Sequence, residues 1–125
     1  MPRTNNEIAE RLVALCRAND EATGLDELYS PDAVSVESVA GPGMEHRETK
    51  GLDGIRAKHD WWNSNMEVHS ASVDGPYPHG DDRFALIYEM DATEKASGNR
   101  LQFREVAVYH TANGQIMREE FFYTM

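Results

Sequence analysis

Apolar residues near the start of the chain recur with the spacing of one helical face. Ile8, Leu12 and Leu15 stand four and three residues apart, so a helix brings their side chains onto one side. Thr4 and Glu7 precede most of this run with the spacing of a capping box, in which each side chain satisfies a backbone N–H of the first turn. The pattern predicts a long N-terminal helix with a buried apolar face.

Two further helices are predicted. Leu25 and Leu28 belong to a short second helix, which we expect to end at Pro31 because proline disfavours helical backbone in the residue before it. A stretch at 40–51, rich in glycine and proline, is expected to be a loop, and a third helix follows it. One face of the third helix is formed by Ile55, His59 and Trp62.

Alternating apolar and polar residues predict five strands. Ala33–Ser38 alternates, and four more strand-like stretches follow at about 66–73, 83–92, 101–110 and 115–124. Breaks rich in glycine, proline and asparagine separate these four stretches, which is typical of hairpins and hence of antiparallel pairing. The order of elements indicates an α+β fold, with helices gathered on one face of a curved antiparallel sheet.

The stretch 83–92 has a clear division between its two faces. Glu89 and Asp91 fall on one face, together with two smaller apolar residues, and are expected at the solvent. The other face is uniformly large and apolar, so we expect it to face the interior. That inward set consists of Phe84, Leu86, Tyr88 and Met90.

The composition and net charge of the chain argue against some classes of binding partner. The chain has 125 residues, which fits one domain spanning 1–125, and a formal net charge of −10. Such an acidic chain is a poor match for nucleic acid or an anionic membrane surface, and no apolar run approaches the length of a membrane span. We expect a cytoplasmic protein. Cys16 is the only cysteine and the five histidines form no paired motif, so no metal site is predicted.

The last predicted hairpin brings two glutamates together. If the turn at 111–113 pairs His110 with Gly114, Glu105 lies opposite Glu119. Two carboxyls side by side in an apolar setting share a proton, and the pKa of one rises, so that it can serve as an acid at neutral pH. A register slipped by one residue, or a solvated face, would instead leave both as surface charges. The same face carries Leu101, Phe103, Phe121 and Tyr123.

A resemblance to a known superfamily is carried by two segments, Leu28–Glu37 (LYSPDAVSVE) and Glu105–Tyr123 (EVAVYHTANGQIMREEFFY). They resemble the nuclear transport factor 2-like superfamily, and most of all its SnoaL-like branch of small polyketide cyclases. The superfamily also includes ketosteroid isomerases and limonene-type epoxide hydrolases. The resemblance implies a cone-shaped half-barrel, in which the sheet wraps around the long helix and encloses an apolar pocket.

The resemblance also implies roles for single residues. Glu37 matches the aspartate base of ketosteroid isomerases, and Glu105 resembles their late-strand acid, which donates a hydrogen bond to an oxyanion. Their tyrosine in the first helix is absent, because the nearest positions here are Leu12 and Val13. The Asp–Arg–Asp arrangement of the epoxide hydrolases is matched less well, since no suitable arginine lies at 89–91.

Two functions are compatible with this reading. The first is a cofactor-independent acid–base enzyme of the isomerase or cyclase type, acting on a small apolar carbonyl or polycyclic compound. In it Glu37 is the base, and Glu105, kept protonated beside Glu119, is the acid. The alternative is a non-catalytic module that binds a small hydrophobic molecule or another protein. The expected ligand-binding residues are His59, Trp62, Tyr88, Phe103, Phe121 and Tyr123.

The outer face of the sheet is expected to form a homodimer. It mixes apolar and charged side chains and is too apolar for an open surface. The resemblance implies the same mode of assembly. The apolar residues predicted on this face are Val106, Val108, Ile116 and Phe122.

Overall fold

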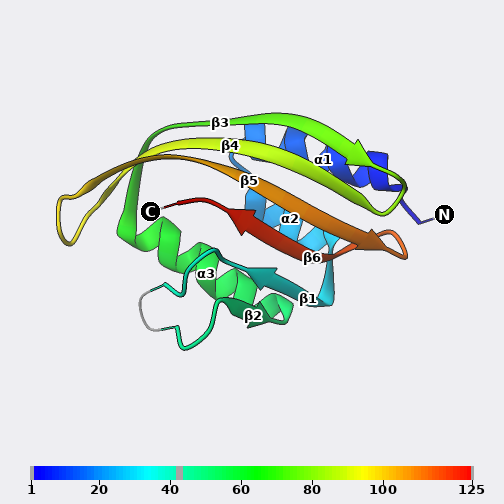
Figure 1. Ribbon diagram of the computed structural model, residues 1–125, viewed down its shortest axis with the longest axis horizontal. Helices are drawn as coiled ribbons and strands as arrows, with labels where there is room; N and C mark the ends of the chain where they lie inside the picture. The colour runs from blue at the N-terminus through cyan, green and yellow to red at the C-terminus, as the bar shows by residue number, and fades with distance from the viewer. Residues whose placement is uncertain (1, 42–43, 125) are drawn as a thin grey trace.

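The computed structural model describes residues 2–41 and 44–124, and it has the predicted α+β architecture (Figure 1). The helices of this part of the chain are α1 (Asn5–Arg17), α2 (Glu21–Leu28) and α3 (Leu52–Asn65). Its strands are β1 (Tyr29–Val36), β2 (Glu48–Lys50), β3 (Met66–His79), β4 (Arg83–Glu94), β5 (Arg100–Ala112) and β6 (Gln115–Phe122).

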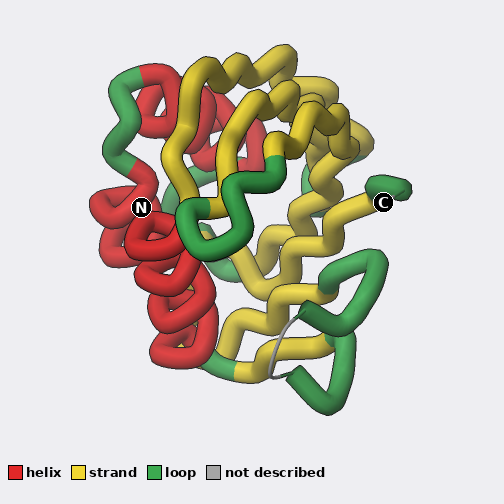
Figure 2. The backbone as a smooth tube through the Cα atoms, turned by 90° about the vertical axis from the view of Figure 1, so that its left-hand side faces the viewer, coloured by secondary structure: helices red, strands yellow, loops and turns green. Residues whose placement is uncertain are grey.

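One sheet contains all of these strands, in the order β2-β1-β6-β5-β4-β3. The four late strands form the predicted antiparallel meander, whereas β1 runs parallel to β6. The sheet is therefore mixed, because hairpin signals describe only strands that follow one another along the chain. Figure 2 shows the helices together on one side of the strands. The sheet curves around them, as expected for a cone-shaped half-barrel, while an enclosed apolar pocket stays a prediction.

The predicted face of α1 is confirmed. Ile8, Leu12 and Leu15 are buried, and they belong to the hydrophobic core. Thr4 and Glu7 form the predicted capping box, with each side chain accepting a hydrogen bond from the other residue's backbone N–H. The N-terminal pattern therefore fixes both where this helix starts and which side of it faces the sheet.

The second helix is shorter than predicted. It ends at Leu28, and Tyr29 already begins β1, so that Pro31 lies within the strand instead of ending a helix. The pairing with β6 is irregular between Tyr29 and Val34, which accommodates a residue that cannot donate to the strand ladder. The loop predicted at 40–51 contains the short strand β2.

The register predicted for the last hairpin is wrong. Asn113 and Gly114 form a tight turn with positive φ at both positions, and Ala112 pairs with Gln115. An irregularity between His110 and Thr111 then shifts the ladder by one further residue. The shift changes which side chains lie opposite one another, although Glu105 and Glu119 still face the same side of the sheet.

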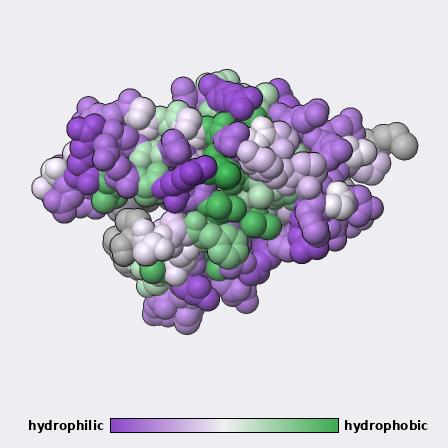
Figure 3. Space-filling view, turned by 45° about the horizontal axis from the view of Figure 1, so that its top comes forward, coloured by the Kyte–Doolittle hydropathy of each residue, from purple (hydrophilic) through white to green (hydrophobic). Residues whose placement is uncertain are grey.

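The concave face of the sheet carries the core, and its outer face is partly apolar. Phe84 and Leu86 are buried and Glu89 is exposed, which confirms the alternation predicted for β4. Val106 and Phe122 are 39% and 50% exposed, respectively, on the outer face. Ile116 was predicted beside them, but the irregular pairing of β6 turns it into the core, where it is fully buried. Hydrophobic residues also gather in the middle of the face shown in Figure 3.

Candidate functional site

A lysine and a tyrosine hold Glu37 just beyond the end of β1. Lys58 of α3 brings its Nζ to 2.6 Å from Glu37 Oε1. Tyr123, which directly follows β6, donates its hydroxyl to Glu37 Oε2 at 2.9 Å. The side chains of Glu37 and Lys58 are 20% and 21% exposed, so the ion pair is partly shielded from water but open at one side. A carboxyl group in this position is held by a donor on each oxygen and remains accessible on one side.

A second carboxylate lies deeper in the same network. Lys58 donates to Ser35 Oγ at 2.8 Å, and Ser35 donates in turn to Glu119 Oε2 at 2.7 Å. Tyr29 donates its hydroxyl to the other oxygen of Glu119. Ser35 and Glu119 are 0% and 2% exposed. Hydrogen-bond donors therefore occupy both oxygens of Glu119, which fits an anchor better than a group that meets a ligand.

Glu105 lies in a different environment on β5. Within residues 2–41 and 44–124, no side chain donates a hydrogen bond to its carboxyl group. The pKa of Glu105 is raised to about 7, mainly by burial; the negative charges of Glu37 and Glu119 contribute to this shift, and the positive charge of Lys58 opposes it. Both protonation states are consequently populated near neutral pH. Such a group can act as a general acid or base without the help of a metal.

Aromatic side chains lie next to this cluster. Trp62 and Phe103 meet edge to face with ring centroids 6.2 Å apart, and Phe103 lies 6.5 Å from Tyr123. The ammonium of Lys58 stands 5.7 Å from the centre of the Phe121 ring. These rings offer a flat apolar compound contact area next to the carboxyls.

Further hydroxyl groups and a thiol lie buried on the same side of the sheet. The Tyr88 and Tyr109 hydroxyls are 2.8 Å apart, and Cys16 Sγ lies 3.6 Å from the Tyr88 hydroxyl. Burial raises the pKa of both phenols well above 10 and that of the Cys16 thiol to about 11. These groups stay neutral at physiological pH. Tyr88, predicted to bind a ligand, thus has its hydroxyl engaged inside the protein.

The structure brings most of the predicted residues together but changes their relations. The predicted facing pair of Glu105 and Glu119 does not exist, because Tyr109 lies opposite Glu119 in the ladder. Glu119 acts on Glu105 as a nearby charge. His59 is half-buried on α3, and no hydrogen bond of its ring is found among the described residues.

Lys58, Ser35 and Tyr29 were missed as site residues. Lys58 precedes His59 and stands three residues after Ile55, so the helical spacing already placed it toward the buried face. A lysine on such a face signals a buried charge that needs a partner. Its partner could not be foreseen, because the contact depends on how α3 crosses β1.

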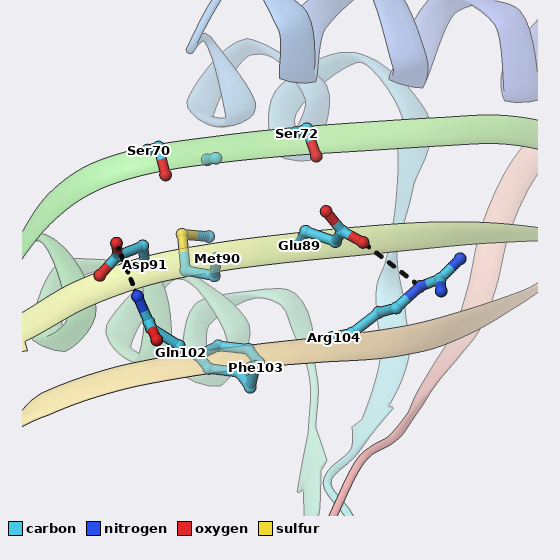
Figure 4. A pocket seen from close by; sticks show the side chains of 9 residues that line it. Ser70, Ser72, Glu89, Met90, Asp91, Gln102, Phe103 and Arg104 are labelled. Carbon is cyan, nitrogen blue, oxygen red and sulfur yellow. Dashed lines mark hydrogen bonds and ion pairs between the residues drawn. The ribbon is translucent and has the colours of Figure 1, made fainter.

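A hollow lies against β3, β4 and β5, and Phe103 of the aromatic group also lines it. Its volume is about 510 Å³, and Figure 4 shows its polar lining side chains. Arg104 lies 3.6 Å from Glu89, while Arg100 and Gln102 donate to Asp91. Hydrogen bonds from Arg100 hold the pKa of Asp91 down at about 2. The acidic pair considered for epoxide hydrolysis therefore sits on the opposite face from Glu37 and is bound by arginines.

The described residues contain neither a metal-binding cluster nor a membrane-spanning helix. No group of three or more histidine, cysteine, aspartate or glutamate side chains in this part of the chain could hold a metal ion. None of its helices is long and apolar enough to cross a membrane.

The curved mixed sheet, the helices on its concave side and the acidic cluster at one end define a protein of the nuclear transport factor 2-like class. Within that class the chain belongs to the SnoaL-like domain family, whose model matches residues 3–123. The crystal structure of a provisional SnoaL-like polyketide cyclase (also labelled carbohydrate phosphatase) from Mesorhizobium loti superimposes with a TM-score of 0.89. Its sequence is 38% identical, and the match covers 97% of this chain and 100% of that one.

More distant structures share the fold alone. A nuclear transport factor 2-like protein of Burkholderia thailandensis is 18% identical with a TM-score of 0.81, covering 98% of this chain and 92% of that one. A ketosteroid isomerase-like protein of Catenulispora acidiphila, solved with trimethylamine, is 15% identical with a TM-score of 0.72, covering 95% of this chain and 86% of that one. No curated protein matches the chain.

Proposed function

We propose that this protein is a cofactor-independent acid–base enzyme of the isomerase or cyclase type. The observation that carries the proposal is the contrast between two neighbouring carboxyls. Glu37 is oriented by Lys58 and Tyr123, whereas Glu105 has no donor among the described residues and a pKa of about 7. Two carboxyls with unlike environments supply a base and an acid to one substrate.

The reaction we propose is proton abstraction next to a carbonyl group. Glu37 removes the proton from the carbon atom, and the electron pair moves into the carbonyl. Glu105, in its protonated form, donates a hydrogen bond or its proton to the carbonyl oxygen. In an isomerase, the conjugated enol of an unsaturated ketone takes the proton back from Glu37 at another carbon and returns its O–H proton to Glu105. In a cyclase, the enol carbon attacks a second carbonyl of the same molecule, the oxygen of that carbonyl takes the proton from Glu37, and the first oxygen returns its proton to Glu105. The carbonyl itself accepts the electrons, so the chemistry needs no cofactor.

The proposed substrate is a small apolar carbonyl or polycyclic compound. Trp62, Phe103 and Tyr123 form a connected row of rings beside the carboxyls, which favours a flat apolar body. The Mesorhizobium loti relative is provisionally a polyketide cyclase, which agrees with a substrate of this kind.

The proposal can be tested without the natural substrate. We expect the protein to accelerate exchange of the acidic protons of 2-tetralone with solvent in D₂O, followed by ¹H NMR. Glu37→Gln keeps the size of the side chain and removes the base, so exchange should fall to the rate of buffer alone. Glu105→Gln should slow exchange by about 10²-fold or more, the usual contribution of a positioned acid.

Glu10→Gln is the matched control, because Glu10 is exposed on α1 and distant in sequence from the cluster. It should leave the exchange rate unchanged. If neither 2-tetralone nor a panel of smaller and larger ring ketones exchanges faster than in buffer, the proposal is wrong. Saturable binding of these ketones without exchange would then favour the non-catalytic ligand-binding module.

A further inference from the structure

We propose that Lys58 is a positioning residue of the acid–base pair, fixed by Ser35 and the buried Glu119 so that its ammonium holds the Glu37 carboxylate and compensates its charge. The proposal deepens the function proposed above and rests on it. It assigns a purpose to the buried half of the network, which does not itself reach the open end of the site.

The first support is the geometry around Lys58. One ammonium group lies 2.6 Å from Glu37 Oε1 and 2.8 Å from Ser35 Oγ. A lysine side chain has four rotatable carbon segments, so a single contact would leave its position loose. Here Lys58 Nζ contacts both Glu37 and Ser35, which lie near the end of the same strand, β1, and these two contacts fix its position. The carboxylate of Glu37 is then held by Lys58 on one oxygen and by Tyr123 on the other.

The second support is the way Ser35 is used. Its hydroxyl accepts from Lys58 and donates to Glu119, and it is fully inaccessible to solvent. A buried serine with both bonds satisfied has one allowed hydroxyl orientation. Glu119, in turn, is held by the Tyr29 hydroxyl on its other oxygen. The chain of contacts thus runs from buried side chains of β1 and β6 to the ammonium group of Lys58.

The third support is the balance of charge. The ionisable groups linked to Lys58 by direct contact, through this network or by charge are Glu37 beyond β1, Glu105 on β5, Glu119 on β6 and Tyr123 beyond β6, together with Tyr29 on β1. Three of them are carboxyls, and Lys58 is the one cation of this network within the described residues. Without its charge, an ionised Glu37 would repel the conjugate base of Glu105 without compensation.

The test follows the titration of Glu105 by ¹³C NMR of its side-chain carboxyl, assigned with Glu105→Gln. In the unmodified protein we expect a midpoint near 7. Lys58→Met removes the charge and keeps an apolar chain of similar length, and it should raise this midpoint by about half a unit or more. Ser35→Ala should move the midpoint in the same direction by a smaller amount, because it loosens Lys58 without removing it.

The decisive variant combines the two changes. If Ser35 acts through Lys58, then Ser35→Ala has no further effect on the Glu105 midpoint once Lys58 is methionine. If Ser35 only fills space near the site, the two shifts add. Lys58→Arg keeps the charge and should return the midpoint most of the way to that of the unmodified protein.

Arg56→Met is the matched control. Arg56 lies on the same helix, and its ion pair with Asp26 involves none of the network residues. It should leave the midpoint within about 0.2 unit of the starting value, as expected for a distant screened charge. An unchanged or lowered midpoint in Lys58→Met, or additive shifts in the double variant, overturns the proposal. Should Lys58→Met not fold, an unchanged midpoint in Ser35→Ala alone has the same consequence.

This experiment uses the protein without substrate, so its outcome is independent of turnover. Failure of the ketone exchange assay with the expected titration shifts would refute only the catalytic function. Exchange activity together with an unmoved Glu105 midpoint in Lys58→Met would refute only the role of Lys58.

Discussion

Tyr109 of β5 lies opposite Glu119 of β6. In the predicted register, which pairs His110 with Gly114, Glu105 would lie there instead. The tight Asn113–Gly114 turn and the irregularity next to it cause this shift. As a consequence, the buried Glu119 accepts hydrogen bonds from two hydroxyl groups, whereas Glu105 lies farther along the sheet and has no such donor in the described part of the chain. The two glutamates therefore have different environments and should respond to the same substitution in opposite ways.

Glu105→Gln should stabilise the protein above neutral pH. The folded-state pKa of about 7 exceeds the ordinary value of 4.5, so between these values the native state holds a proton that the unfolded state has released. Stability then falls as pH rises from 4.5 to 7, and the full penalty is present above 7. Glutamine carries no such penalty. We expect a gain of about 1–3 kcal/mol at pH 8 and little change at pH 4.

Urea unfolding of the two proteins from pH 4 to pH 8 measures this difference. Glu67→Gln on the exposed part of β3 is the control and should show no pH-dependent gain. A Glu105→Gln variant that is no more stable at pH 8 than at pH 4, relative to the unmodified protein, would contradict the raised pKa.

Glu119→Gln should destabilise the protein at pH 7. Glu119 accepts buried hydrogen bonds from Tyr29 and Ser35 on separate oxygens, and an amide retains only one acceptor oxygen. A buried donor left without a partner costs about 1–3 kcal/mol. Tyr29→Phe removes one donor and should cost less, about 1 kcal/mol. Urea unfolding at pH 7 compares the two variants, and a Glu119→Gln protein as stable as the unmodified one would show that this carboxyl is not an anchor.

The sequence predicted the α+β fold and most of its elements, but not all of the strand pairing. Periodicity located α1, the late strands and the inward face of β4, because apolar spacing directly records which side is buried. The pairing and register of the strands were harder to predict from the sequence. The turn residues Asn113 and Gly114 are visible in the sequence, but the extra residue that changes the ladder is not. The parallel contact of β1 with β6 likewise has no local signal.

Site residues could be predicted from the sequence where the residue type itself suggested a chemical role. The prediction from Glu37 and Glu105 stands on two carboxyls that the fold does bring near each other. Lys58 and Ser35 were not predicted as site residues, because their role depends on contacts between α3 and β1. A serine within a strand and a lysine on a helix have many ordinary explanations until those elements are placed side by side.

Gly114→Ala should destabilise the protein more than Gly98→Ala. Both glycines have positive φ, 76° and 74°, so alanine carries a similar backbone cost at each, about 1 kcal/mol. At Gly114 a new Cβ would also come within 2.8 Å of Pro2 Cβ and 3.0 Å of the Arg3 nitrogen, whereas at Gly98 it meets nothing within 4 Å. The difference between their thermal unfolding free energies isolates the packing of the N-terminus on the turn. Equal losses would mean that this packing contributes nothing.

The outer face of the sheet leads to the last prediction. Val106 and Phe122 are paired neighbours on it and are 39% and 50% exposed. Charged side chains lie along the same face, with Arg83 toward one end and Glu89 toward the other. Glu89 already pairs with Arg104 of its own copy, so the apolar centre supplies the contact, and a two-fold axis through it would bring Val106 and Phe122 against their counterparts in a second copy. We therefore propose a homodimer formed by this face.

Val106→Glu should break the proposed dimer, because it places a charge at the centre of the contact, where it cannot be paired. Light scattering should give twice the chain mass of 14.1 kDa for the unmodified protein at micromolar concentration, and the single mass for the variant. Val68→Glu is the matched control, since Val68 is 45% exposed but lies on the edge strand β3 away from that centre. It should remain a dimer. A monomeric unmodified protein, or equal dissociation of both variants, would remove the outer face as the contact.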